Sequence, residues 1–313
     1  MPWHEQREIV SAAEATGYTA LFVPEIAARE AFTSLTAFAG WTDRVRLGTG
    51  VVTTWSRTPS VTAMAAATGH EYSEGRAILG VGSGTAPAGQ DPGSALERVR
   101  AYVRTIRTIL SGETVGPGDP FGADGFRLGL ELPDGAPPIW VAALGDRMVR
   151  LAAEVGDGMI LNWCTPGRVA VAREILDEAA ERVGRDPADL TVAVYVRACL
   201  GVNRAVAMEV LGAAAAQYAA MPHYHRQLEG MGLGQEGRAA EAAFRAGRLG
   251  DVPESLVREL TVSGGRSEVL ERFESYREAG ADLVICYPVP ALEPVSSIMG
   301  TLLAAAPNPA FER

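Results

Sequence analysis

Residues 44–85 read RVRLGTGVVTTWSRTPSVTAMAAATGHEYSEGRAILGVGSGT, and this stretch decides the fold. It contains two apolar runs, 45–52 and 77–81, that are continuous rather than alternating, which is typical of parallel strands buried on both faces. Between them, Thr58-Pro59 opens a helix of small and apolar residues, a crossover of the length that parallel pairing needs. The stretch therefore predicts a βαβ unit.

Both strands of this unit run into glycine at their carboxyl ends, where a backbone without side chains can approach a flat ligand. The glycines are Gly48, Gly50, Gly80, Gly82 and Gly84. A dinucleotide fingerprint is disfavoured, because the last glycine of G-x-G-x-x-G would fall on Thr85 and no helix follows directly. The remaining alternatives are a ligand cradle and a simple turn from strand into loop.

Strands and helices alternate through the rest of the chain, which predicts a single domain over residues 1–313 built as a (β/α)8 barrel. Residues 205–260 read as several helices in place of one crossover, so they predict a helical insertion. The chain enters its first helix directly after Met1-Pro2, which leaves seven recognisable strands. We therefore expect a barrel that lacks its first strand and is open between 20–23 and 283–287, or one whose gap another segment or subunit fills.

The formal net charge of −10 argues against general affinity for nucleic acid or anionic membrane and favours a small-molecule substrate. The three cysteines lie far apart in apolar settings, as expected of buried thiols in a reducing compartment. The sequence carries no signal-peptide pattern and no apolar run of membrane-spanning length, so we expect a cytoplasmic protein.

The pair His223 and His225 is the one feature that suggests a metal. Residues at i and i+2 diverge on a helix, and no cysteine or acidic residue stands at a useful spacing. We expect no metal site, and contact with substrate is the better interpretation of these side chains.

Four segments together resemble the luciferase-like monooxygenase superfamily: RVRLGTGV, the SRTP helix start, GRAILGVGSG and PIWVAALG. The similarity runs from about Trp3 to about Pro290 and is greatest to the branch of coenzyme F420-dependent reductases similar to methylenetetrahydromethanopterin reductase. It implies a (β/α) barrel with its site at the strand carboxyl ends, and an oxidoreductase in which the deazaflavin F420 carries the hydride. It also implies a cis Gly50-Val51 peptide behind the cofactor ring. We further expect a homodimer.

The resemblance places the cofactor at the carboxyl ends of four strands and at the helix N-termini that follow two of them. The expected cofactor-binding residues are Gly50, Val51, Gly82, Ser83, Gly84, Ala143, Leu144, Gly145, Asn162 and Thr165. Among them, Asn162, Thr165 and the amides near Gly145 are expected to bind the cofactor phosphate. Glu25 matches the acidic residue that lies beside the deazaflavin ring in the family, although a solvated loop carboxylate remains the alternative.

Related enzymes often carry a catalytic Glu after the glycine series, and this chain has Thr85 there. The His and Trp of sugar-oxidising relatives are replaced by Ile26 and Glu30. Oxidation of an alcohol by a His/Glu pair is therefore disfavoured, and reduction of a C=C or C=N bond fits better. The proton would come from Glu25, Tyr195, a Tyr or His of the insertion, or water. Two alternatives stay open, an FMN-dependent monooxygenase and a homologue that binds ligand without cofactor or redox activity.

Overall fold

The computed structural model describes residues 2–26, 29–89, 93–133 and 135–307, so the outer limits of the expected 1–313 domain lie outside the described residues. The strands are β1 (Ala20–Val23), β2 (Arg46–Thr49), β3 (Val52–Thr53), β4 (Ala77–Gly82), β5 (Ile139–Ala142), β6 (Gly158–Asn162), β7 (Thr191–Leu200), β8 (Thr261–Gly264) and β9 (Leu283–Pro288). The α-helices are α1 (Trp3–Ala15), α2 (Ala31–Ala39), α3 (Pro59–Tyr72), α4 (Ala95–Leu110), α5 (Asp146–Val155), α6 (Pro166–Arg182), α7 (Arg204–Ala219), α8 (Pro222–Gly230), α9 (Gly234–Arg245), α10 (Glu254–Leu260), α11 (Arg266–Glu278) and α12 (Pro294–Ala304).

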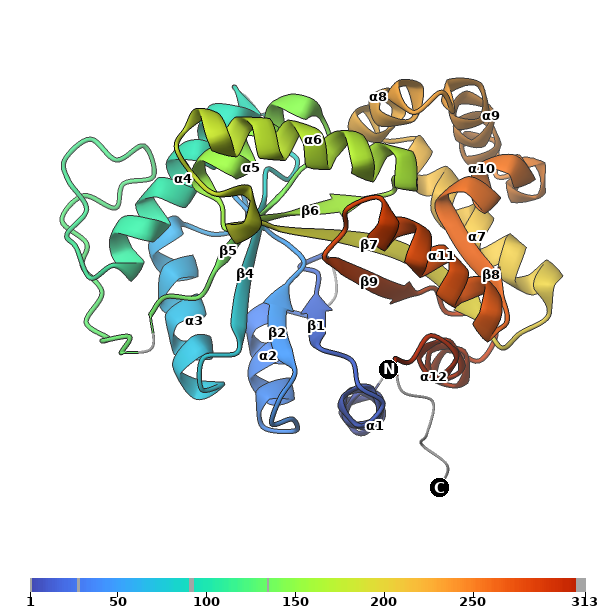
Figure 1. The fold of residues 1–313 in the computed structure, drawn as a ribbon, viewed down its shortest axis with the longest axis horizontal. Helices are drawn as coiled ribbons and strands as arrows, with labels where there is room; N and C mark the ends of the chain where they lie inside the picture. The colour runs from blue at the N-terminus through green and yellow to red at the C-terminus, as the bar shows by residue number, and fades with distance from the viewer. Residues whose placement is uncertain (1, 27–28, 90–92, 134, 308–313) are drawn as a thin grey trace.

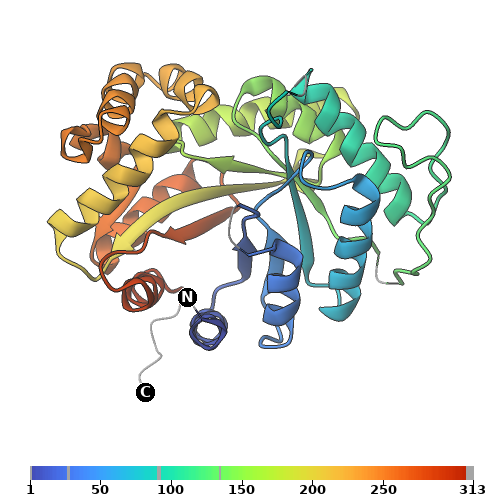
Figure 2. The same cartoon turned by 180° about the vertical axis from the view of Figure 1, so that it is seen from behind.

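The strands form one parallel sheet in the order β1-β2-β4-β5-β6-β7-β8. In addition, β3 pairs with β4, and β9 pairs with residues 193–198 of β7, parallel in both cases. The sheet curls, with helices packed on its outside (Figures 1 and 2). This arrangement confirms the expected α/β barrel type of fold.

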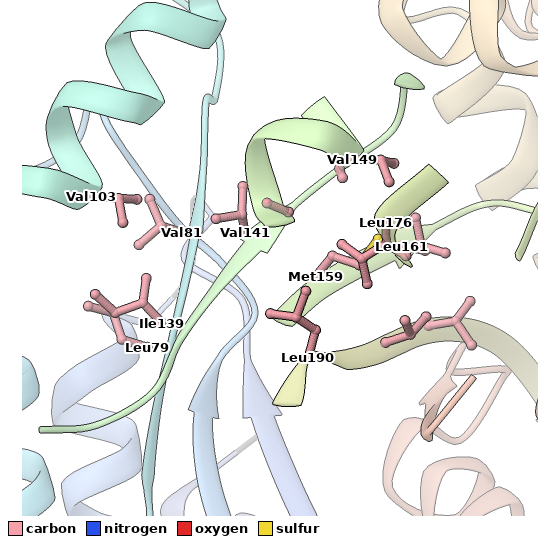
Figure 3. Close-up of a cluster of buried hydrophobic side chains, with 14 of the residues drawn as sticks. Leu79, Val81, Val103, Ile139, Val141, Val149, Met159, Leu161, Leu176 and Leu190 are labelled. Carbon is pink, nitrogen blue, oxygen red and sulfur yellow. The ribbon is translucent and has the colours of Figure 1, made fainter. Parts of the chain in front are cut away.

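The main core lies between the sheet and the outer helices. Figure 3 shows how strand side chains meet helix side chains there, with Val81 facing Val103 of α4 and Leu161 near Leu176 of α6. The amphipathic pattern of α4 explains its position, because its apolar residues recur every three or four positions and are buried while the arginines between them are not. The central strands are covered by side chains on both of their faces, which explains why their sequences are continuously apolar.

The sheet is open between β1 and β9. Within the described residues no pairing joins these two strands, which agrees with the expected open barrel. Every residue of β1 and of β9 is half-buried, whereas nine of the ten residues of β7 are buried. Helices α1 and α12 lie side by side next to this opening (Figures 1 and 2), where the Tyr18 hydroxyl donates to the Leu302 carbonyl over 2.8 Å.

Two parts of the sheet differ from the expectation of seven strands. The run 45–52 is divided into β2 and β3 at Gly50-Val51, and this peptide is cis, as the resemblance implied. Strand β8 was not expected, because Thr-Val-Ser-Gly directly after a helix offers no apolar run. It pairs with the last four residues of β7, two of which, Arg197 and Ala198, also pair with β9 on the opposite edge.

The region expected as a helical insertion consists of α7, α8, α9 and α10. These helices gather above the end of β7 in Figure 1. They enclose a second apolar cluster that includes Trp163 from the loop after β6 and Tyr224 from α8. The insertion therefore packs against the carboxyl ends of β6 and β7.

Glu14 connects α1 to the loop before β2, and its loss is expected to destabilise the protein in a pH-dependent way. Its carboxylate accepts hydrogen bonds from the amides of Asp43, Arg44 and Val45 at 3.0–3.1 Å. Partial burial alone would raise its pKa, but these amide hydrogen bonds outweigh burial and lower the pKa below its usual 4.5. The stabilisation is therefore present above the unfolded-state pKa and is lost as the pH falls through the lower pKa of the folded state.

Glu14→Gln should lower the free energy of unfolding by about 1 kcal/mol at pH 7, after allowance for solvent screening, and by much less at pH 3. Urea unfolding at the two pH values measures this, with Glu8→Gln on the exposed side of α1 as the control. Equal losses at both pH values would contradict the assignment.

Candidate functional site

The expected cofactor-binding residues lie at one edge of the sheet. Because the neighbouring strands are parallel, their carboxyl ends meet there, with Thr53 opposite Gly82, Val81 opposite Val141, and Ala142 opposite Ile160. The structure thus brings together the carboxyl ends of β2 and β3, β4, β5 and β6. They carry Gly50 and Val51 between β2 and β3, Gly82 to Gly84 after β4, Ala143 to Gly145 after β5, and Asn162 and Thr165 at the end of β6 and in the loop that follows it.

Small residues bring these strand ends into close contact. A Cβ atom on Gly82 would lie 2.8 Å from Cγ2 of Val51 and 3.3 Å from Cβ of Ala142. Gly84 has φ +66°, a conformation that favours glycine, and a Cβ there would lie 2.6 Å from Cβ of Thr53. The result is a wall of backbone and small side chains beside the cis peptide, the kind of surface that a flat ring system can approach.

Tyr195 lies on the inner side of this wall. Its hydroxyl donates to the Gly50 carbonyl over 3.2 Å, and a Cβ atom on Gly50 would lie only 1.8 Å from that hydroxyl. Burial raises the pKa of Tyr195 far above its usual value, so the phenol stays protonated and able to donate. As placed, Tyr195 supports the cis peptide from the barrel interior, and its expected part in proton transfer remains a prediction.

Glu25 is held next to the cis peptide by an arginine that the sequence analysis did not single out. Its amide donates to the Val51 carbonyl over 3.3 Å, and its carboxylate accepts from Nε of Arg57 at 2.9 and 3.1 Å. The side chain is only 14% exposed, so the alternative of a solvated carboxylate does not describe it. Arg57 also pairs with Glu30, whose carboxylate accepts from the first amides of α2. The sequence signal that could have identified Arg57 is the SRTP segment, which contains it.

The helix N-termini after β5 and β6 form the other end of the site. Gly145 precedes α5 and provides no side-chain cap, while the Thr165 hydroxyl accepts from the Arg168 amide of α6 over 3.3 Å. Arg168 was also missed. Its guanidinium donates to the Leu144 carbonyl over 3.0 Å and pairs with Asp146 at 2.9 Å, which brings a positive charge to the region where a phosphate was expected.

Asn162 is positioned differently from the expectation of a free donor. Its side-chain amide nitrogen donates to the Tyr224 hydroxyl over 2.6 Å, and its side-chain oxygen accepts from Arg197. Its side chain is therefore engaged with the helical insertion and with β7. One N–H of the Asn162 side-chain amide is used in this way, and its second N–H remains for the expected hydrogen bond to a phosphate.

The loop after β6 and helix α8, which packs against it, each hold a buried polar atom that has no hydrogen-bond partner in the described part of the chain. These atoms are Nε1 of Trp163 and Oε1 of Gln227. Gln227 uses its side-chain nitrogen to hold the carbonyls of Asn162 and Trp163 at 2.9 and 2.8 Å. A buried donor and a buried acceptor of this kind suit a region that receives a polar ligand.

His223 and His225 lie on α8, away from any arrangement that could hold a metal in the described residues. His225 lies between Glu229 and Glu241, at 3.5 and 3.2 Å. Burial, together with the charge of Arg226, lowers the pKa of His223 below its usual value. The three cysteines are free thiols, and no described helix is both long and apolar enough to cross a membrane.

A curled parallel sheet with helices outside and a small-residue wall at its carboxyl edge defines a barrel-type α/β protein with a ligand site at that edge. The chain belongs to the luciferase-like monooxygenase family, whose model matches residues 1–283. The family expected from the four sequence segments is thereby confirmed.

Similar proteins of known description include a reductase and an oxidoreductase. A 5,10-methylenetetrahydromethanopterin reductase from Archaeoglobus fulgidus is 29% identical over 300 residues, which cover 91% of this chain and 90% of that protein. A putative coenzyme F420-dependent oxidoreductase from Mycobacterium tuberculosis is 30% identical over 314 residues, with 91% and 90% covered.

Solved structures share the fold. The coenzyme F420-dependent tetrahydromethanopterin reductase from Methanopyrus kandleri has a TM-score of 0.77 at 22% identity, over 97% of this chain and 94% of that one. An F420-dependent secondary alcohol dehydrogenase has a TM-score of 0.79 at 17% identity, over 96% and 93%.

Proposed function

We propose that this protein is an F420-dependent oxidoreductase that transfers a hydride between the deazaflavin and a small organic substrate. The observation that carries the proposal is the wall formed by the cis Gly50-Val51 peptide, Gly82 and Ala142 beside the uncapped N-terminus of α5. Such a site offers a flat surface for a ring and backbone amides for an anionic tail. The relative described as a coenzyme F420-dependent oxidoreductase supports the choice of cofactor.

In this proposal the residues divide into two groups. Val51, with Gly82 to Gly84, receives the ring, and the amides near Gly145, with Thr165 and Arg168, receive the anionic tail. Bound F420H2 supplies the hydride. The buried Nε1 of Trp163 and Oε1 of Gln227 fit the polar groups of such a ligand, because they are otherwise without partners in the described residues.

The reaction that we propose is reduction of a C=C or C=N bond. Thr85 replaces an acid, and Glu30 is committed to the first turn of α2 and to Arg57, so neither provides a free base for alcohol oxidation. Glu25 and Tyr195 lie at the cis peptide and are the proposed sources of the proton. Exclusion of water from the site is consistent with the packing of α7 and α8 over the ends of β6 and β7.

A titration of the purified protein with F420 tests this proposal. Saturable quenching of F420 fluorescence is expected, with no comparable binding of FMN. Binding of FMN instead would support the family's flavin-dependent monooxygenase chemistry. Binding of neither would contradict the proposal and support a homologue that binds ligand without redox activity.

The expected homodimer is part of the same proposal, and α3 offers a surface for it. Three of its apolar side chains are exposed, Val61 at 44%, Met64 at 41% and Tyr72 at 58%. Exposed apolar residues gathered on one helix are typical of surfaces that a partner covers.

Met64→Glu is therefore expected to convert a dimer of twice 33.0 kDa into a monomer, since the introduced charge would be buried in the interface. Light scattering after gel filtration measures the mass. Val171→Glu on α6, where Val171 is 46% exposed, is the control and should leave the dimer intact. A monomeric wild-type protein would contradict the proposed dimer.

A further inference from the structure

Arg197 lies on the inner face of β7 near its carboxyl end. Side chains alternate along a strand, and Ala193 and Tyr195 on this face belong to the apolar cluster inside the barrel. Val194 and Val196 on the other face belong to the core under the outer helices. Arg197 is thus one step beyond Tyr195 on the inner face, toward the edge where ligands bind in folds of this class.

Aromatic rings surround this guanidinium. The rings of Trp163 and Tyr287 are both 4.6 Å from it, that of Tyr218 is 5.4 Å and that of Tyr195 is 5.5 Å away. The side chain is only 5% exposed. Rings at such distances stabilise a cation, but they provide no hydrogen-bond acceptor in the plane of the guanidinium.

The charge of Arg197 is not balanced by any carboxylate in the part of the chain that the structure describes. Its one hydrogen bond there joins Nη1 to the side-chain oxygen of Asn162. Nε and Nη2 donate to no described residue. By contrast, Arg57 and Arg168, which also lie near the strand ends, each pair with a carboxylate.

Burying a cation without a counter-ion is unfavourable, so a bound anion is the natural complement of this position. Asn162 fixes the orientation of the guanidinium, because the Asn162 side chain is itself held by the hydrogen bond from its nitrogen to the Tyr224 hydroxyl, over 2.6 Å. This leaves the planar Nε and Nη2 edge for a ligand. An arginine fork matches the two oxygens of a carboxylate, and the aromatic rings match an unsaturated or aromatic skeleton.

We infer that Arg197 anchors the substrate through a carboxylate group, and that the substrate is a planar organic acid. The inference rests on the proposed function, since the acid would lie beside the reducible bond. It adds a substrate class and a specificity-determining residue to that function. Arg197 thereby serves substrate binding and is distinct from the groups proposed to hold F420.

Calorimetric titration with matched acid and amide pairs tests the inference. The probes are benzoate against benzamide and trans-cinnamate against cinnamamide, which keep the shape and remove the charge. Wild-type protein should bind at least one of the acids at least tenfold more tightly than its amide. Arg197→Met should abolish this preference, and Arg197→Lys should retain part of it, because lysine keeps the charge but loses the planar fork.

Two further measurements separate the possible explanations. The affinity of Arg197→Met for F420 should equal that of wild type, and a tenfold loss would assign Arg197 to the cofactor and overturn the inference. A purely structural arginine would lower the melting temperature on substitution without changing the acid preference, which would also overturn it. Failure of wild-type protein to bind F420 would refute the proposed function, whereas intact F420 binding without any acid preference would refute this inference alone.

Discussion

Gly80→Ala is expected to lower the free energy of unfolding by about 3 kcal/mol, because the added methyl group has no space. A Cβ atom there would lie 2.1 Å from the Thr49 carbonyl oxygen and 3.1 Å from side-chain atoms of Ile160 and Val51. The Thr49 backbone cannot shift easily, because the Thr49 side chain is hydrogen-bonded to Gly80. The Thr49 hydroxyl donates to the Gly80 carbonyl and accepts from the Gly80 amide, both at 2.8 Å. It thereby bridges β2 and β4 where their regular pairing has ended.

Urea unfolding monitored by circular dichroism measures this loss. Gly116→Ala is the matched control, since a Cβ atom at Gly116 would have no heavy atom within 4 Å. The control should change the free energy of unfolding by less than about 0.5 kcal/mol. A Gly80→Ala protein as stable as the control would mean that the backbone at Thr49 and Gly80 is looser than the structure describes.

Thr165→Glu is expected to weaken F420 binding about 100-fold. The residue lies at the N-terminus of α6 beside Arg168 and Leu144, where the anionic tail of the cofactor is proposed to bind. A unit charge within about 4 Å of another costs roughly 4 kcal/mol near a protein surface, and mobility of the new side chain reduces this by about a third. The loss should diminish at high salt, because the repulsion is electrostatic.

Thr165→Gln isolates the charge, since it has the shape of Glu and removes the same helix cap. Fluorescence titration should give Thr165→Gln a dissociation constant for F420 within about tenfold of the wild-type value. The constant for Thr165→Glu should be raised well beyond that range. If the Thr165→Glu and Thr165→Gln proteins bind F420 with equal affinity, the phosphate does not lie at Thr165 and the assignment of this end of the site is wrong.

The strands that the sequence predicted share one property, a run of mostly apolar residues at least four positions long. Ala20–Val23 was predicted with the bounds that the structure gives it. Thr261–Gly264 failed this test, because its four residues become a strand only through pairing with the end of β7. The division of β2 from β3 likewise depends on a single peptide bond that a hydrophobicity pattern does not register.

The candidate site shows the same limit. Glycines after strands were visible in the sequence, because a local backbone requirement selects them. Arg57, Arg168 and Arg197 matter through partners that are distant along the chain, such as Glu25 for Arg57 and Tyr287 for Arg197. Only the presence of an arginine in the otherwise apolar 191–202 run gave any hint of Arg197, and nothing in the sequence indicated that the insertion would bury it.

The long strand β7 has a consequence for how the molecule opens. It is paired with β6 and then β8 along one edge and with β9 along the other. Its outer end also contacts the helices of the insertion, so barrel and insertion share it as a common element (Figure 2). Local opening of either part leaves most partners of β7 in place. Its amide protons should therefore exchange with deuterium only through global unfolding, whereas those of β1, at the open side of the sheet, exchange through smaller fluctuations.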